Sequence, residues 1–137
     1  ADVTIVAGCG IHNCGVDTSL HAGIHTFYLE KGAHVRYIER HYGEGDGNGE
    51  NIMNPQTIVH MQEGSYMEME TTQIKGIDST ERITRADMAE NATLEIREKI
   101  MTHGRQYAKT DFVETAAAAI WFHVPSPKGI PNRSFSL

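Results

Sequence analysis

The sequence predicts an all-β protein built from stacked, repeated units that each consist of a turn and a strand. Three segments share one pattern, in which a Gly or Asn suited to a turn with positive φ is followed by residues that alternate between apolar and polar. The separations between the repeats are 32 and 27 residues, as in a stacked-coil protein with insertions on one side. The segments are LEKGAHVRY (29–37), MQEGSYMEM (61–69) and MAENATLEI (88–96), with the turn residues Gly32, Gly64 and Asn91.

The alternation assigns one buried and one solvated face to each repeated strand. The apolar residues that we expect to be buried are Val35, Tyr37, Met67, Met69, Leu94 and Ile96. Residues 85–101 resemble an amphipathic helix, but period two fits better around Thr93–Glu98 and agrees with the two earlier repeats. Further strands are predicted at Val3–Ala7, His25–Leu29, Thr57–Met61, Arg82–Ala86 and Tyr107–Val113.

Composition restricts the classes of function. The chain has 137 residues, a formal net charge of −6 and a pI of about 5.7, and it lacks the Lys and Arg clusters that neutralise phosphates, so nucleic acid is not expected as a partner. The longest apolar run, Ala116–Phe122, is far shorter than the ~20 residues that cross a bilayer. With two cysteines in one short segment and no secretory pattern, a reduced, cytoplasmic protein is expected.

The acidic, glycine-rich stretch HYGEGDGNGEN (41–51) is interpreted as a solvated loop. It is not a phosphate loop, because its glycines alternate with Glu44, Asp46 and Glu50 instead of preceding Lys and Ser or Thr. It is a poor calcium loop as well, because Asn51 occupies the position where an EF-hand has Gly and Thr57 the position of the bidentate Glu. We therefore expect an excursion between strands.

Candidate metal ligands lie near the start of the chain. Cys9, His12 and Cys14 lie within GCGIHNCG, and thiols with imidazole are ligands for zinc or an iron–sulfur centre. Their spacing fits no standard ligand pair, so a turn with an incidental buried thiol stays open as the alternative. His41 completes the candidate set as a further metal-binding imidazole, with an exposed loop residue as the favoured alternative.

No catalytic constellation emerges from the spacing, and we do not expect an enzyme. The stretch ETTQIKGIDSTERIT contains Ser79, but no histidine lies nearby in the sequence to complete a hydrolase triad. From composition and pattern alone, the chain is an acidic β-repeat protein. Two alternatives remain for its function: a structural or interaction β-solenoid without cluster chemistry, and a carbohydrate-binding β-helix protein that would use acids such as Glu68, Glu70 and Glu95 with Tyr66.

The segments RYIERHYGEGDGNGENIMNPQTIV, EMETTQIKGIDSTERIT and EKIMTHG resemble the SufB/SufD family of iron–sulfur cluster assembly proteins, in particular the short SufB-like type of archaea and anaerobes. The resemblance covers residues 1–114. It implies a right-handed parallel β-helix of stacked coils and a scaffold subunit that holds an iron–sulfur cluster transiently. It further implies a SufC-like ATPase and a SufB/SufD-like subunit as partners, or a homodimer. Longer relatives have YIEGCSAP where this chain has YIERHYGE, so Arg40 and His41 replace Gly-Cys and a sulfur-relay role there is in doubt.

Residues 115–137 differ in character from the segment before them. They contain three of the four prolines and the only Trp, and they lack the alternation and turn spacing of residues 1–114. A frameshift near 116–120 would explain the change, because Ile120–Arg133 can be encoded so that reading two bases later contains SRSVAKG, as the family resemblance implies. We expect a truncated or out-of-frame tail, with the family's cluster-linked residues and SufC-docking region beyond this chain; a divergent natural tail is the alternative.

Overall fold

The computed structural model describes residues 1–101, 104, 106–114, 118–124 and 133–136, and every regular element among them is a β-strand. The strands differ in length, from three residues in β2 and β5 to 11 residues in β1 and β4. Their bounds are β1 (Asp2–His12), β2 (Ser19–His21), β3 (Ile24–Leu29), β4 (His34–Glu44), β5 (Asn51–Met53), β6 (Gln56–Met61), β7 (Tyr66–Gln73), β8 (Ser79–Met88), β9 (Thr93–Ile100), β10 (Gln106–Glu114), β11 (Ala119–Val124) and β12 (Arg133–Ser136).

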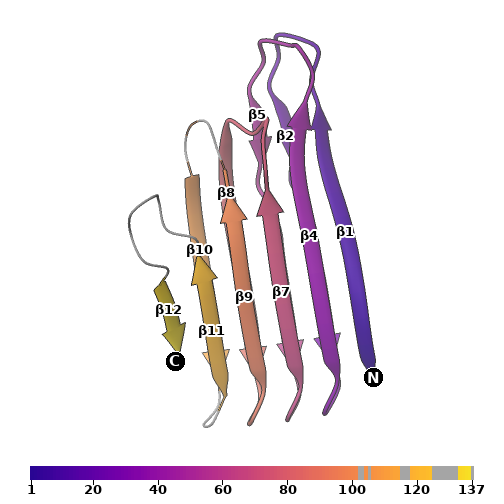
Figure 1. Cartoon of the computed structure of the whole chain (residues 1–137), viewed down its shortest axis with the longest axis vertical. Helices are drawn as coiled ribbons and strands as arrows, with labels where there is room; N and C mark the ends of the chain where they lie inside the picture. Colours follow the sequence, from indigo (N-terminus) through magenta and orange to yellow (C-terminus); the bar gives the residue numbers. More distant parts are fainter. Residues whose placement is uncertain (102–103, 105, 115–117, 125–132, 137) are drawn as a thin grey trace.

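The strands form two sheets that lie one behind the other (Figure 1). The first sheet has the order β1-β4-β7-β9-β11-β12, and all its pairs are parallel except β11 with β12. The second sheet has the order β2-β5-β8-β6-β3, in which β8 spans the length of both β5 and β6, and β10 pairs with the other side of β8. Successive strands of the chain pass between the two sheets, so that residues far apart in sequence become neighbours.

The predicted repeats are confirmed in register and in their turns. His34 lies beside Tyr66 and Tyr66 beside Thr93, which reproduces the two sequence separations between the repeats. Gly32 and Gly64 have φ of 70° and 65°, and Asn91 has φ of 57°, the left-handed conformation that the turn before each strand requires. All five further predicted strands lie within β1, β3, β6, β8 and β10.

The predicted right-handed parallel β-helix, however, is wrong. The described strands form two open, mostly parallel sheets that face each other as in a β-sandwich, and they close into neither a barrel nor a solenoid. The physical reason lies in strand length: β1 and β4 have 11 residues each, so the chain builds two broad faces instead of rings of short strands. Repeat spacing reports only which residues become lateral neighbours, and it does not specify how the chain travels between them.

The core lies between the two sheets and changes character along the strands. At the amino-terminal halves of β4, β7 and β9 it is apolar, and the predicted inner residues Tyr37, Met67 and Leu94 are at most 1% exposed. Val59, Met61, Ala86 and Met88 of the second sheet pack against this end. Toward the carboxyl ends of β4 and β7 the inner face becomes polar and charged, with the buried residues Glu39, His41, Thr71 and Gln73 opposite Thr80, Arg82 and Thr84 of β8.

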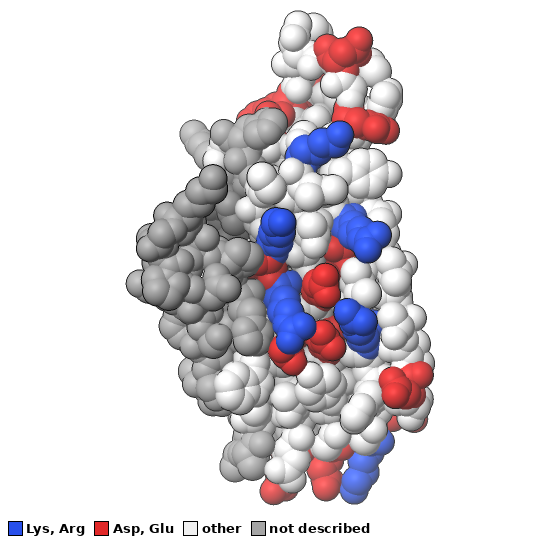
Figure 2. Space-filling view, viewed as in Figure 1, with Lys and Arg blue, Asp and Glu red and all other residues white. Residues whose placement is uncertain are grey.

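The outer face of the first sheet is solvated and carries both signs of charge, as the alternation predicts. Figure 2 shows basic and acidic side chains interspersed over this face. Arg97 bonds Glu68 and Glu95 at 3.2 and 2.6 Å, and Arg36 lies 3.9 Å from Glu68. Such exposed ion pairs contribute little to the free energy of unfolding, so we interpret this face as ordinary solvated surface.

Two boundaries differ from expectation. Residues 41–44 belong to β4 and not to a solvated loop, and His41 is fully buried, so its interpretation as an exposed loop residue is wrong. In the segment expected to diverge, β11 continues the first sheet beside β9. The segments 115–117 and 125–132, the second of which carries all three prolines of that tail, lie outside the described residues. No helix with the length and apolar character of a membrane span occurs in the part of the chain that the structure describes.

Candidate metal centre

Three side chains with metal-binding atoms converge at the polar end of the core. Cys9 comes from β1, His25 from β3 and Glu39 from β4, and one ligand atom of each lies within 4.8 Å of the other two. The topology explains the convergence: β1 and β4 are parallel neighbours in the first sheet, whereas β3 belongs to the facing sheet. Cys9 and His25 are half-buried, whereas Glu39 is only 1% exposed.

Tyr37 ties His25 to Glu39. Its hydroxyl donates to Glu39 Oε1 at 2.9 Å and lies 2.6 Å from His25 Nδ1. Because the phenol has only one proton, which goes to the carboxylate, His25 Nδ1 must donate to the phenol oxygen. His25 Nδ1 also lies 3.1 Å from Glu39 Oε1. The imidazole is therefore held against the carboxylate by a fixed neighbour.

On its inner side, Glu39 faces the buried side chains of His41 and Arg82. His41 Nε2 lies 3.2 Å from Glu39 Oε1, and Arg82 NH2 lies 4.0 Å from Glu39 Oε2 and 3.5 Å from Glu98 Oε1. Arg82 NH1 is 3.3 Å from His41 Nδ1, and since guanidinium can only donate, His41 Nδ1 accepts and Nε2 carries the proton. Neither Glu39 Oε2 nor His41 Nε2 makes an aligned hydrogen bond, so the carboxylate keeps acceptor capacity in a buried position.

The electrostatics keep Glu39 ionised and disfavour ionisation of Cys9 and Tyr37. Burial raises the pKa of Glu39, but the nearby His41 imidazole, with help from Tyr37 and Arg82, outweighs burial and lowers it to about 2. Burial and then the charge of Glu39 raise the pKa of the Cys9 thiol, and they also raise that of Tyr37. Burial likewise raises the pKa of Glu98, against the opposing charge of Arg82. A cation entering this group would meet one fixed negative charge and would have to displace the thiol proton.

Thiolate, imidazole and carboxylate together suit Zn²⁺ or Fe²⁺. Ligand atoms that share one tetrahedral ion lie about 3.5 Å apart, given metal–ligand bonds of about 2.0 to 2.3 Å. The observed spread of up to 4.8 Å can therefore close by adjustment of side chains. Three protein ligands leave a fourth position for water or another ligand, which is the arrangement of a reactive site and not of a closed structural one.

The structure divides the residues that the sequence nominated. Cys9 belongs to the three-residue group, and His41, its lateral neighbour in the β1–β4 register, contacts Glu39 from the other side. His12 and Cys14 lie beyond, near the end of β1, where both are exposed and Cys14 Sγ is 3.0 Å from His12 Nε2. Within the described residues, the one group of three or more metal-type side chains is Cys9 with His25 and Glu39. Metal binding by His12, Cys14 and His41 stays a prediction from the sequence.

Sequence reasoning missed the roles of His25, Glu39 and Arg82. A signal for Glu39 was present, because the alternation that buries Tyr37 also points residues 39 and 41 inward. Cys9 and His41 are also separated by the repeat length of 32 residues, which predicts that they are lateral neighbours. No local pattern pointed to His25 or Arg82, because they come from strands of the opposite sheet.

Comparison of this chain with family models, with curated proteins and with solved structures found no match. The resemblance to the SufB/SufD family therefore remains a prediction from sequence motifs.

Proposed function

We propose that this chain is a SufB/SufD-like component of iron–sulfur cluster assembly that binds iron at Cys9, His25 and Glu39. The observation that carries the proposal is the convergence of a thiol, an imidazole and a buried carboxylate within 4.8 Å, in a chain whose motifs resemble that family. The two-sheet fold lends no support, because the β-helix expected from the resemblance is absent. The site and the motifs are the supporting observations.

The chemistry of the group suits a transient iron ligand better than a permanent one. Glu39 offers a charge that is already present, whereas Cys9 must lose its proton before it binds, because its pKa is raised. Metal binding at such a site releases a proton and weakens as the pH falls. The fourth position would accept sulfide or a ligand from another subunit. His41 and Arg82 hold Glu39 from behind and are supporting residues, not ligands.

In this role the chain is a cytoplasmic scaffold subunit. It works with a SufC-like ATPase and a SufB/SufD-like subunit, or with a second copy of itself. The chain contributes no ATP hydrolysis of its own in this proposal, because its glycine-rich stretch has the wrong charge for phosphate. The cluster is cargo for this subunit and not a resident cofactor.

Metal binding is tested first with Co²⁺, whose thiolate complexes absorb visibly and in the near ultraviolet. We expect a stoichiometric complex with a sulfur-to-cobalt band that is lost in Cys9→Ser and weakened in His25→Gln and Glu39→Gln. His34→Gln, which removes an exposed imidazole at the start of β4, is the matched control. An unchanged sulfur band in Cys9→Ser would exclude this group as the site.

Cluster assembly is tested by anaerobic reconstitution of the chain with iron and sulfide, alone and with a purified SufC-like ATPase. We expect visible absorbance from a bound cluster that depends on Cys9. If the chain binds cobalt but shows no cluster absorbance, either alone or with the ATPase, the assembly role is refuted and the chain is a metal-binding protein only.

An interaction protein without cluster chemistry is a second candidate, favoured by the open edges of both sheets. β1 ends the first sheet, and β2 and β3 end the second. These strands expose apolar side chains, with Val6, Leu20 and Ile24 each about 60% exposed. Unpaired strand edges with apolar side chains pair readily with another chain. Sedimentation analysis that finds a defined complex but no metal-dependent change would favour this candidate.

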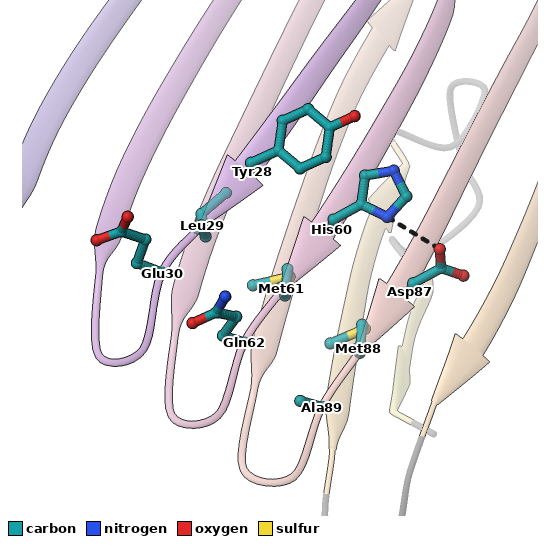
Figure 3. A pocket seen from close by; sticks show the side chains of 9 residues that line it. All are labelled: Tyr28, Leu29, Glu30, His60, Met61, Gln62, Asp87, Met88 and Ala89. Atoms are coloured by element: carbon teal, nitrogen blue, oxygen red, sulfur yellow. Dashed lines mark ion pairs between the residues drawn. The ribbon is translucent and has the colours of Figure 1, made fainter.

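A carbohydrate-binding role has one supporting feature on the outer face of the second sheet. Tyr28, His60 and Asp87 lie in a row across β3, β6 and β8, beside a shallow groove (Figure 3). The rings of Tyr28 and His60 stack with centroids 4.8 Å apart, and His60 Nδ1 lies 3.0 Å from Asp87 Oδ2. Exposed aromatic rings beside polar groups bind sugars. The test is a glycan screen of the parent and of Tyr28→Ala. The role is excluded if the parent binds no glycan, or if every glycan that it binds is bound equally by Tyr28→Ala.

A further inference from the structure

A second group of reactive side chains lies at the carboxyl end of β1, apart from the candidate metal centre. His12 and Glu44 are direct partners in the β1–β4 register, which places their side chains next to each other. Glu44 Oε1 lies 3.7 Å from His12 Nδ1, and His12 Nε2 lies 3.0 Å from Cys14 Sγ. The two imidazole nitrogens thus face a carboxylate on one side and a thiol on the other.

This order of groups is that of an activated nucleophile. The carboxylate favours the tautomer with its proton on Nδ1, and this tautomer leaves the lone pair of Nε2 to accept the thiol proton. Cys14 is exposed, and the side chains of His12 and Glu44 are 66% and 61% exposed, so a small molecule in solution can reach the sulfur. The arrangement pairs a nucleophile with a base and a group that orients the base.

The backbone around Cys14 is held by the glycine-rich segment that follows β4. Asn13 N donates to Glu44 O at 2.9 Å, and Gly47 N donates to Asn13 O at 3.1 Å. One residue after Cys14, Gly15 O accepts from Gly49 N at 3.1 Å. A Cβ added to Gly47 would clash with the backbone of Gly15, so glycine permits this close approach. The acidic stretch therefore positions the thiol instead of forming a free loop.

We propose that Cys14 is a reactive thiol that undergoes exchange with low-molecular-weight disulfides, with His12 as its base and Glu44 as a positioning residue. His12 Nε2 takes the thiol proton, and the sulfur of Cys14 attacks one sulfur of the disulfide R–S–S–R. A Cys14–S–S–R bond forms as the R–S–S–R bond breaks, and the thiolate that leaves takes the proton from His12. The disulfide is reduced by two electrons and Cys14 is oxidised, so no further oxidant is needed.

The product remains a mixed disulfide on this chain. The sequence holds only two cysteines: Cys9 lies within β1, and Cys14 lies five residues later, beyond the end of that strand. Five residues of extended chain span about 16 Å. A disulfide between them would require their Cα atoms to lie within about 7 Å. Cys14 is therefore a modification site, not one half of an internal redox pair.

The test uses the full chain, fully reduced, with glutathione disulfide in excess at pH 7 and EDTA present. Acid quenching and fragment-ion mass spectrometry then give the modification rate of Cys14, with Cys9 of the same molecule as internal reference. An unassisted thiol with a pKa of about 8.5 is about 3% ionised at pH 7, so assistance is limited to roughly 30-fold. We expect Cys14 to react about tenfold faster than Cys9, and His12→Gln to remove most of that advantage.

Three comparisons make the result decisive. Glu44→Gln should slow Cys14 by about twofold to threefold through loss of orientation, whereas the matched control His34→Gln should leave the rate unchanged. At pH 10, where thiols are ionised without a base, the parent and His12→Gln should converge. The proposal is overturned if His12→Gln reacts within twofold of the parent at pH 7, or if His34→Gln slows the reaction equally. Fast modification that appears only after EDTA is added would overturn it as well, since His12 and Cys14 would then hold a metal.

Discussion

Substitution of Glu39 by Gln should remove an acid-dependent part of the stability of this protein. Glu39 is 1% exposed, and its carboxylate faces Tyr37, His41 and Arg82. Its pKa is lowered from 4.5 to about 2, because the contacts with His41, Tyr37 and Arg82 outweigh the effect of burial. At about 1.4 kcal/mol for each pKa unit, this difference corresponds to about 3 kcal/mol of unfolding free energy.

The direction of the effect follows from proton binding. The unfolded chain binds the Glu39 proton more tightly than the folded protein does, so the contribution of Glu39 is fully present above pH 4.5. It declines as the pH falls toward 2. Glu98 acts in the opposite sense, because burial raises its pKa and its contribution decreases as the pH rises above 4.5.

The measurement is urea denaturation of parent and Glu39→Gln between pH 2.5 and pH 6, with EDTA present to exclude metal. At pH 6 the variant should be less stable by about 3 kcal/mol, in line with the cost of breaking a buried ion pair. The gap should narrow toward zero as the pH approaches 2. Glu81→Gln, a change at an exposed carboxyl, provides the control for loss of one surface charge.

A gap that stays constant across this pH range would refute the reasoning, because it would mean that the amide disrupts packing and that the carboxylate charge is irrelevant. A variant more stable than the parent at pH 6 would also refute it. In that case the desolvation penalty of the Glu39 carboxylate would exceed the stabilisation that His41 and Arg82 provide.

The other predictions concern the turns, the core and the outer face. Gly32→Ala should lower the unfolding free energy by about 1–2 kcal/mol through backbone strain alone, because φ is 70° and no atom lies within 4 Å of the added Cβ. Gly8→Ala, with equal space around the added Cβ and no positive φ, should leave the unfolding free energy unchanged in the same urea assay. Leu94→Ala, at a fully buried position, should lower the unfolding free energy by about 2–5 kcal/mol; a loss below 1 kcal/mol would contradict the packed core. Hydrogen bonding to Glu95 raises the pKa of Tyr66 to about 12, so the phenol's contribution to stability persists below pH 10 and is lost through pH 12. The ultraviolet titration difference between the parent and Tyr66→Phe should therefore have its midpoint near 12, and a midpoint near 10 would contradict the bond.

The repeat pattern predicted the strands, their inner residues and their turns, because these depend on local chemistry. Gly32 and Asn91 adopt positive φ because the chain must reverse there, and Met67 points inward because strand side chains alternate. How the strands divide between two sheets depends on strand length and inter-sheet packing. Neither leaves a mark in a repeat of 32 or 27 residues, so the β-helix prediction failed.

The candidate site was only partly visible from sequence for a similar reason. Cys9 stood out by its chemistry, and the alternation that predicted burial of Tyr37 extends to Glu39 and His41. The acidic and glycine-rich residues after His41 suggested solvent exposure instead. Burial of the Glu39 carboxylate beside His41 is tolerated because Arg82 reaches both side chains from the facing sheet. No local sequence pattern reveals such a long-range contact.

The change from an apolar to a charged core along the strands gives the two ends of the sandwich different resistance to opening. Around Met67 and Leu94, separation of the sheets would hydrate apolar surface, so backbone amides there should exchange with solvent slowly. At the other end, water would satisfy groups that lack hydrogen bonds, including Glu39 Oε2 and the Arg82 Nε. Amide exchange should thus be fastest where Cys9, His25 and Glu39 lie. An ion bound by Cys9 and Glu39 of the first sheet and by His25 of the second would link the two sheets at that end. Its release would allow a local opening that leaves the apolar half folded.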